Sequence, residues 1–209
     1  MIAIIDCGIG NLRSVYNAFQ AIGAAAFIAA SPEQLDHAEA LVLPGVGAFG
    51  NGMARLTDGG FAEAIRDQAG SAKKPLLGIC LGLQLLAEWG AEDGNQAGLG
   101  LLAGTVERLK TPAGDGQFKL PHIGWNDVAI RGDSMLYRGL GDRETFYFAN
   151  SYALEPADDA MVSGTCDHGA PFVASVEKGN LCAVQFHPEK SQKAGLRVLR
   201  NWCDMVAEC

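Results

Sequence analysis

The first half of the chain alternates short apolar runs with stretches of helical periodicity. The apolar runs are continuous, which is typical of parallel strands that are covered on both faces. They are residues 2–5, 26–29 and 41–43, and residues 74–77 are the entry to a further short buried strand. Between and after them, apolar side chains recur with helical spacing. The predicted helices are residues 12–22, with Asn11 as the cap, then 31–34, 49–56, 60–69 and 83–88. This alternation predicts a doubly wound α/β sheet.

The second half of the chain has a different pattern, in which short strand-like pieces follow one another across glycine-rich and acidic turns. These pieces are residues 105–109, 127–130, 145–148, 161–165, 171–176 and 182–186. Such spacing favours antiparallel pairing. An apolar stripe over residues 190–206 predicts a closing helix. We expect one domain over residues 1–209, with a mixed, largely parallel central sheet, flanking helices and antiparallel strands in the C-terminal half.

Composition narrows the possible partners and compartment. The chain has 24 acidic and 16 basic residues and a formal charge of -8, so nucleic acid and anionic membranes are poor partners. No apolar run is long enough to cross a membrane, and the N-terminus lacks the basic region of a signal peptide. Six cysteines without a Cys-x-x-Cys pair indicate reduced thiols in the cytoplasm, with neither a disulfide framework nor a metal site.

The sequence Gly-Ile-Cys-Leu-Gly at residues 78–82 places one reactive side chain between a predicted strand and a predicted helix. Glycine on both sides relieves the crowding of a tight strand-to-helix turn, so Cys80 can stand at the top of a sheet like the nucleophile of a hydrolase elbow. The start of a helix also favours a thiolate. The alternative is that Cys80 is a small buried hydrophobic residue.

The second chemical motif is His-Pro-Glu at residues 187–189, just after a predicted buried strand. In extended backbone His187 and Glu189 point to the same side, and Pro188 is expected to keep the pair out of a helix. A histidine held by a carboxylate is the base and orienting group of a triad. Cys80 and His187 both follow strands, where open α/β sheets place their sites. Taken alone, His187 could instead be a buried, hydrogen-bonded histidine.

These two motifs together resemble the class I (triad) glutamine amidotransferase family, whose fold is flavodoxin-like. Within that family, further stretches are similar to the glutaminase subunits of imidazole glycerol phosphate synthase, which serve histidine biosynthesis. The stretches are residues 6–12, 43–49, 121–126, 147–152 and 185–191. The resemblance covers the chain from residue 6 to the last helix. It implies hydrolysis of glutamine to glutamate and ammonia without a cofactor or metal.

The resemblance also implies roles for individual residues. Cys80 would attack the glutamine amide, His187 would transfer protons and Glu189 would orient His187. The oxyanion would be held by backbone N–H groups of Leu81 and of Val46 or Gly47. The glutamine would be bound by Gln84, Glu92, Asn150, Ser151 and Tyr152. From the residues alone, Gln84 could be a polar residue on a helix face and Glu92 a solvated loop acid.

One position departs from the family pattern, because histidine usually stands where this chain has Asn150. Asparagine keeps hydrogen-bonding capacity but cannot carry a proton. This departure leaves room for an alternative function, the glutaminase subunit of another ammonia-using synthase such as one for surface-sugar amination. Two interpretations lie outside glutamine chemistry. One is a cysteine peptidase or chaperone-like relative with the same elbow, and the other is a non-catalytic scaffold.

The resemblance implies a partner, because the chain has no phosphate-binding loop and no spare length for a second active site. The expected partner is a (β/α)8 cyclase subunit that receives ammonia and makes imidazole glycerol phosphate and an aminoimidazole carboxamide ribotide. We expect residues 119–126 to lie at that interface, with Lys119, Trp125 as aromatic anchor, and Asn126. This run is required by no strand or helix pattern. The alternative is that Trp125 belongs to the core.

Overall fold

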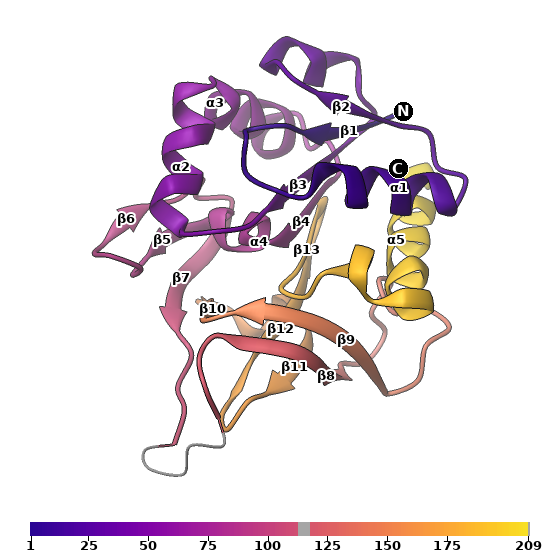
Figure 1. Cartoon of the computed structure of the whole chain (residues 1–209). Helices are drawn as coiled ribbons and strands as arrows, with labels where there is room; N and C mark the ends of the chain where they lie inside the picture. The colour runs from indigo at the N-terminus through magenta and orange to yellow at the C-terminus, as the bar shows by residue number, and fades with distance from the viewer. Residues whose placement is uncertain (113–117, 209) are drawn as a thin grey trace.

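The computed structural model describes residues 1–112 and 118–208, so Cys209 lies outside the described residues (Figure 1). Its first half, together with one strand from near the C-terminus, forms the parallel part of a large sheet. The strands, in spatial order, are β2 (Ala26–Ala29), β1 (Ile2–Ile5), β3 (Ala40–Gly45), β4 (Leu76–Cys80) and β13 (Leu181–Val184). β1, β3, β4 and β13 are buried along their whole length, as continuous apolar runs require.

The sheet changes from parallel to antiparallel at β13. This strand is parallel to β4 on one side and antiparallel to β12 on the other. The sheet continues through β12 (Pro171–Lys178), β11 (Val162–Asp167), β8 (His122–Ile130) and β9 (Arg143–Asn150), which makes nine strands among the described residues. The prediction of a mixed sheet with antiparallel strands in the second half is therefore confirmed.

A smaller sheet of four strands, again counted over residues 1–112 and 118–208, was not predicted as such. It contains β10 (Tyr152–Pro156), β7 (Leu102–Arg108), β5 (Ala87–Gly90) and β6 (Gln96–Ala97). The predicted helix over residues 83–88 was wrong at its end. The helix stops at Leu85, and Ala87 begins a strand that pairs with Leu102. Tertiary pairing with β7 overrides the local helical pattern here.

Helices cover both faces of the large sheet (Figure 1). The α-helices are α1 (Leu12–Ala21), α2 (Phe49–Asp58), α3 (Phe61–Ile65), α4 (Leu81–Leu85) and α5 (Gln192–Ala207). Short turns are η1 (Pro32–His37), η2 (Arg66–Ser71), η3 (Asp159–Met161) and η4 (Pro188–Lys190). Helices α1 and α5 pack on one face, where the rings of Phe19 and Trp202 meet edge to face at 6.0 Å, and α2 and α3 pack on the other.

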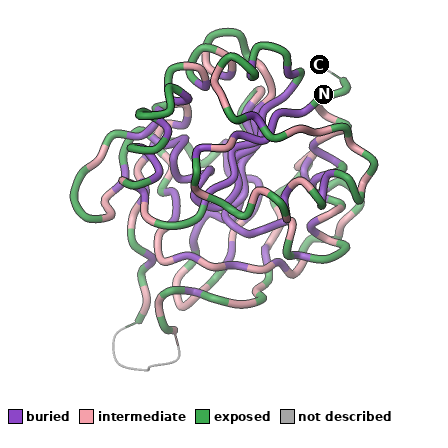
Figure 2. Tube along the Cα trace, turned by 45° about the horizontal axis from the view of Figure 1, so that its top comes forward, coloured by how far each residue is buried: buried purple, intermediate pink, exposed green. Residues whose placement is uncertain are grey.

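Burial follows this layered arrangement. Figure 2 shows the buried residues concentrated along the central strands, with exposed residues on the outer turns. The Asn11 side chain accepts a hydrogen bond from the Ser14 N–H, which confirms the predicted cap of α1. No helix in the described ranges is both long enough and apolar enough to span a bilayer.

The structure differs from the local sequence pattern at two places near the motifs. No strand or helix pattern required residues 122–126, but they form the first half of β8 and pair with β9. Pro188 was expected to exclude a helix, but it occupies the first turn of η4, a position where its fixed φ and missing N–H are well tolerated. Pairing with β9 accounts for residues 122–126, and the position of Pro188 at the start of a turn accounts for η4.

Candidate active site

The Cys80 backbone has the strained geometry of a strand-to-helix elbow. Cys80 is the last residue of β4 and has φ 55° and ψ −110°, outside the regions that residues other than glycine normally adopt. The flanking glycines allow this geometry. A Cβ on Gly82 would lie 1.7 Å from the Leu43 carbonyl oxygen, and a Cβ on Gly78 would lie 2.9 Å from the Leu83 nitrogen. The helix α4 is short, so its contribution at Cys80 is a few N–H groups rather than a long macrodipole.

The elbow gives a stability prediction. Gly82→Ala should lower the free energy of unfolding by about 3 kcal/mol, because the added methyl group overlaps backbone that cannot move without distorting β3. Urea unfolding followed by circular dichroism measures the change. Gly141→Ala is the matched control, since its Cβ would meet nothing closer than 3.7 Å and should change stability by less than about 0.5 kcal/mol. Equal stability of the two variants would contradict the steric account.

His187 and Glu189 meet Cys80 because β13 lies directly beside β4. Val184 pairs with Ile79, so the segment after β13 leaves the sheet next to the elbow. The Nδ1 of His187 lies 2.8 Å from Oε1 of Glu189, and Cys80 is close enough to His187 to raise its pKa through hydrogen-bonding and charge interactions. His187 and Glu189 are almost completely buried. The structure therefore brings together the three side chains that the sequence singled out.

The surroundings of His187 favour its protonated form. Burial lowers its pKa, but hydrogen bonds and charge interactions with Cys80 and Glu189 outweigh burial and raise the pKa from 6.5 to about 9. The second carboxylate oxygen of Glu189 is buried without a hydrogen-bond partner among the described residues. Glu189 thus directs its interaction toward the imidazole.

The raised pKa predicts how stability depends on pH. Because the folded pKa of His187 exceeds its ordinary value, its contribution to stability should be complete below about pH 6.5 and lost as the pH rises through about 9. In Cys80→Ala, the loss should begin at lower pH, because one interaction that raises the pKa is gone. Urea unfolding from pH 6 to 10 measures both profiles. Coincident profiles would show that Cys80 does not act on His187.

Gln185 is a site residue that the sequence did not single out. Its side chain is fully buried, and its Nε2 lies 3.7 Å from the Cys80 sulfur. Its Oε1 accepts a hydrogen bond from Gln84 Nε2 at 3.0 Å, and the same nitrogen donates to the Tyr152 carbonyl at 2.9 Å. The available signal was the position of Gln185, two residues before His187 and therefore on the same side of the extended chain.

A cavity of about 260 Å³ opens onto these side chains. Every residue proposed for nucleophilic attack, proton transfer, oxyanion binding or glutamine binding lines it except Glu189, which lies behind His187. These lining residues are Val46, Gly47, Cys80, Leu81, Gln84, Glu92, Asn150, Ser151, Tyr152 and His187. Glu92 also accepts a hydrogen bond from the Phe49 N–H at 2.8 Å, so one of its oxygens holds the start of α2. Pro121, Ala149 and Lys190 complete the wall.

The residues expected at an interface differ in their exposure. Trp125 is 49% exposed and Ile123, on the same face of β8, is 64% exposed. The expectation that Trp125 could be a core residue was therefore wrong. Its ring meets the Tyr147 ring edge to face at 6.0 Å, and Tyr147 also lies under the Lys190 ammonium. Lys119 is exposed, whereas Asn126 is half-buried by its own hydrogen bonds.

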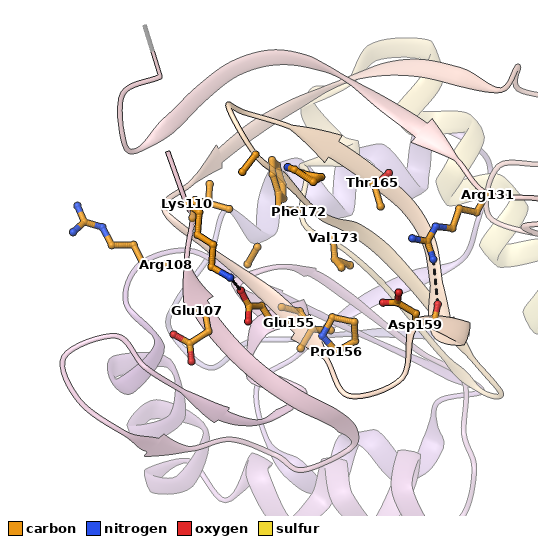
Figure 3. A pocket seen from close by; sticks show the side chains of 15 residues that line it. Glu107, Arg108, Lys110, Arg131, Glu155, Pro156, Asp159, Thr165, Phe172 and Val173 are labelled. Carbon is orange, nitrogen blue, oxygen red and sulfur yellow. Dashed lines mark hydrogen bonds and ion pairs between the residues drawn. The ribbon is translucent and has the colours of Figure 1, made fainter. Parts of the chain in front are cut away.

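A larger cavity, of about 360 Å³, lies between the smaller sheet and strands β11 and β12 (Figure 3). Its wall carries the ion pair of Lys110 with Glu155 and the hydrogen bond from Arg131 to the Asp159 carbonyl. Among the described residues that line it there is no cysteine or histidine. The cavity with the candidate chemistry is therefore the smaller one.

Comparison with known proteins identifies the family of this chain. The family model "Glutamine amidotransferase class-I" matches residues 3–205. The imidazole glycerol phosphate synthase subunit HisH of Methanothermobacter thermautotrophicus is 49% identical over 206 residues, covering 99% of each chain. The corresponding subunit HisH 1 of Campylobacter jejuni is 46% identical over 202 residues, covering 97% of this chain and 98% of that protein.

Solved structures are similar at lower identity. A crystal structure of a glutamine amidotransferase aligns with a TM-score of 0.77 at 20% identity, over 99% of this chain and 100% of that chain. The structure of PurLQS from Thermotoga maritima aligns with a TM-score of 0.74 at 20% identity, over 98% of each chain. These structures support the fold, and the family match and the close relatives establish membership. This chain belongs to the class I glutamine amidotransferase family.

Proposed function

We propose that this chain is the glutaminase subunit of an imidazole glycerol phosphate synthase in histidine biosynthesis. It hydrolyses glutamine to glutamate and ammonia, and a separate cyclase subunit uses the ammonia. The observation that carries the chemistry is the convergence of Cys80, His187 and Glu189 at one cavity. The observation that favours this synthase over a surface-sugar amination pathway is near-full-length identity of 46–49% to HisH subunits.

The first chemical step forms a covalent intermediate. The Cys80 thiolate attacks the side-chain carbonyl carbon of glutamine, and the carbonyl electrons move onto oxygen. The His187 imidazolium gives its proton to the amide nitrogen, and the C–N bond breaks to release ammonia and leave a γ-glutamyl thioester.

The second chemical step hydrolyses the thioester. Neutral His187 takes a proton from water as the water attacks the thioester. Collapse of that adduct releases glutamate and returns the proton to the Cys80–His187 pair.

The cavity wall supplies the remaining groups. We assign the oxyanion to the N–H of Leu81 and to that of Val46 or Gly47, residues that line the cavity, and each such donor is worth about 3 kcal/mol in the transition state. Gly47 has φ 103°, so its backbone is free to turn an N–H inward. We assign the glutamine head group to Gln84, Glu92, Asn150, Ser151 and Tyr152. Glu92 carries the charge that suits the α-ammonium group.

The proposed partner is a (β/α)8 cyclase that docks over the exposed part of β8. Trp125 and Ile123 form an exposed apolar pair on one face of β8, and Trp125 meets Tyr147, which neighbours His187 at 6.5 Å between ring centroids. A partner seated there would cover the cavity and keep ammonia from solvent. We further propose that residues 1–209 act as one domain and that the compartment is the cytoplasm, where thiols stay reduced.

The test of this function is glutamine hydrolysis by the pure chain, alone and with a candidate cyclase and its nucleotide ligand. Glutamate release should be low for the chain alone and should rise at least about tenfold with the liganded cyclase. Absence of turnover in every mixture would overturn the assignment. Ammonia transfer to a sugar-modifying synthase, with no response to the cyclase, would instead favour the alternative pathway.

Trp125 gives a prediction for the partner surface. Trp125→Ala should weaken cyclase binding by about 10- to 100-fold, because a half-exposed aromatic side chain that is buried on docking is typical of an interface anchor. Isothermal titration calorimetry measures the affinity. Trp89→Ala is the matched control, since Trp89 is 46% exposed on β5 and does not line the candidate site. Unchanged affinity of Trp125→Ala would remove this surface from the proposal.

A further inference from the structure

A buried histidine and a buried asparagine face one another across strands β8 and β9. His122 and Asn150 are directly paired in register and are 4% and 5% exposed. Nδ1 of His122 and Oδ1 of Asn150 are both buried without a partner in hydrogen-bonding geometry among the described residues. Burial lowers the pKa of His122, but the Asn150 side chain nevertheless acts to raise it through a hydrogen-bonding interaction. Two neighbouring buried polar atoms without hydrogen-bond partners lower the stability of the folded protein unless they bond to each other.

The neighbouring hydrogen bonds fix which atom is the donor. The Asn126 Oδ1 accepts from the Asp127 N–H, and its Nδ2 donates to the Asp167 carbonyl, so the Asn126 amide has one orientation. That Nδ2 lies 3.2 Å from Nε2 of His122. Nε2 must therefore accept, which places the proton of the neutral imidazole on Nδ1. His122 stays neutral because burial and then the nearby His168 lower its pKa to about 4, although Asn150 acts in the opposite direction.

Asn150 has an equally defined orientation. Its Nδ2 donates to the Tyr152 carbonyl at 3.1 Å, so Oδ1 is the atom left for His122. The same Tyr152 carbonyl accepts from Gln84, and Gln84 is bonded to Gln185 beside the Cys80 sulfur. This chain of hydrogen bonds converges on the Tyr152 carbonyl, which accepts from both Asn150 and Gln84, and it connects the neighbourhood of His122 to the cavity wall.

We propose that His122 is a positioning residue for glutamine binding: its Nδ1–H bonds to Asn150 Oδ1 and so holds Asn150, the Tyr152 carbonyl and Gln84 in their places at the cavity. His122 is itself held by stacking on His168, at 4.2 Å between ring centroids, and on Phe148, at 5.1 Å. It does not line the cavity, so it acts only through its neighbours. This inference rests on the proposed function, since Gln84 and Asn150 are assigned there to glutamine.

The chain of hydrogen bonds begins next to the proposed partner surface. Asn126, which orients His122, directly follows the exposed Trp125. A partner that shifts the first half of β8 would therefore reach the cavity through His122. Because the Asn150 amide donates to Tyr152 through Nδ2, its Oδ1 can only accept, and His122 must therefore be the donor.

Two substitutions of His122 test whether glutamine binding requires the donor at Nδ1 or the imidazole ring as a whole. His122→Asn places an amide N–H near the position of Nδ1 and should leave the KM for glutamine within about twofold. His122→Gln reaches toward Asn126 but offers no donor to Asn150, and its KM should rise about tenfold with kcat within about threefold. A purely structural role predicts loss of active protein in both variants, so kcat would fall while KM stayed constant. A KM of His122→Gln within twofold of the unmodified chain would overturn the proposal.

The tautomer provides a test that does not depend on activity. In the full chain with ¹⁵N-labelled histidine, His122 should show the Nδ1–H tautomer, with a slowly exchanging Nδ1 proton. Asn150→Ala should make that proton exchange at least about tenfold faster. An Nε2–H tautomer would overturn the proposal. If the liganded cyclase complex hydrolyses no glutamine, the proposed function fails, and this spectrum alone decides whether the His122–Asn150 bond exists.

Discussion

Replacing Cys80 with alanine is expected to reduce glutamine hydrolysis at least about 10⁴-fold, because removal of a nucleophile leaves only the binding and oxyanion groups. The measurement is glutamate release in the presence of the liganded cyclase. The fold should persist, since Cys80 is a small side chain at the end of β4 and alanine removes only its sulfur. The near-ultraviolet circular dichroism spectrum should therefore be unchanged.

Cys166 offers the matched control. It is buried on β11, and burial raises the pKa of its thiol to about 12, so it stays protonated. Cys166→Ala should keep at least half of the activity. Alkylation at pH 7 should modify Cys80 before Cys166, which mass spectrometry of the digested protein detects. Residual activity of Cys80→Ala above about 1% would assign the attack to another group.

Replacing Glu189 with glutamine should lower kcat by about 10²- to 10⁴-fold and change KM little. The side chain keeps its size, but it no longer carries the negative charge that stabilises imidazolium, and its amide can turn an N–H toward Nδ1 of His187. The pKa of His187 should fall, because one interaction that raises it is lost. Nuclear magnetic resonance of the imidazole measures the pKa, and steady-state kinetics measure kcat and KM.

Glu155→Gln is the control for this substitution. Glu155 forms an exposed ion pair with Lys110 at the larger cavity, and exposed pairs contribute about 0–1 kcal/mol. Its activity should match that of the unmodified chain. If Glu189→Gln behaved in the same way, Glu189 would be a buried structural acid rather than the group that orients His187.

The sequence was sufficient for the convergence of Cys80 with His187 because both follow apolar runs that form parallel strands. Parallel strands end at one edge of a sheet, and β4 and β13 turned out to be neighbours there. The glycines at 78 and 82 were also informative, because their spacing only makes sense if backbone approaches closely on both sides of Cys80. Local pattern and topology together predicted this part of the site.

The rest depended on pairing that no local pattern encodes. Residues 122–126 contain glycine and mixed polar residues, so their place in β8 follows from the register with β9, from His122 opposite Asn150 onward. The helix after Cys80 has no sequence signal at Leu85, and it ends there because the next residues pair with β7. Gln185 and His122 were missed for the same reason, since their partners are distant in sequence.

The direct pairing of β4 with β13 has a consequence for synthesis of the protein. Cys80 leaves the ribosome long before Gln185, from which it is separated by 105 positions, and nascent chains grow at about 5–20 residues per second. During that interval the translated part of the chain contains Cys80 but lacks His187. The edge of the large sheet at β4 is also unpaired, because β13 has not yet been made. A partly translated chain is therefore unable to consume glutamine, and its unpaired edge is the place where a chaperone or a wrong neighbour would bind.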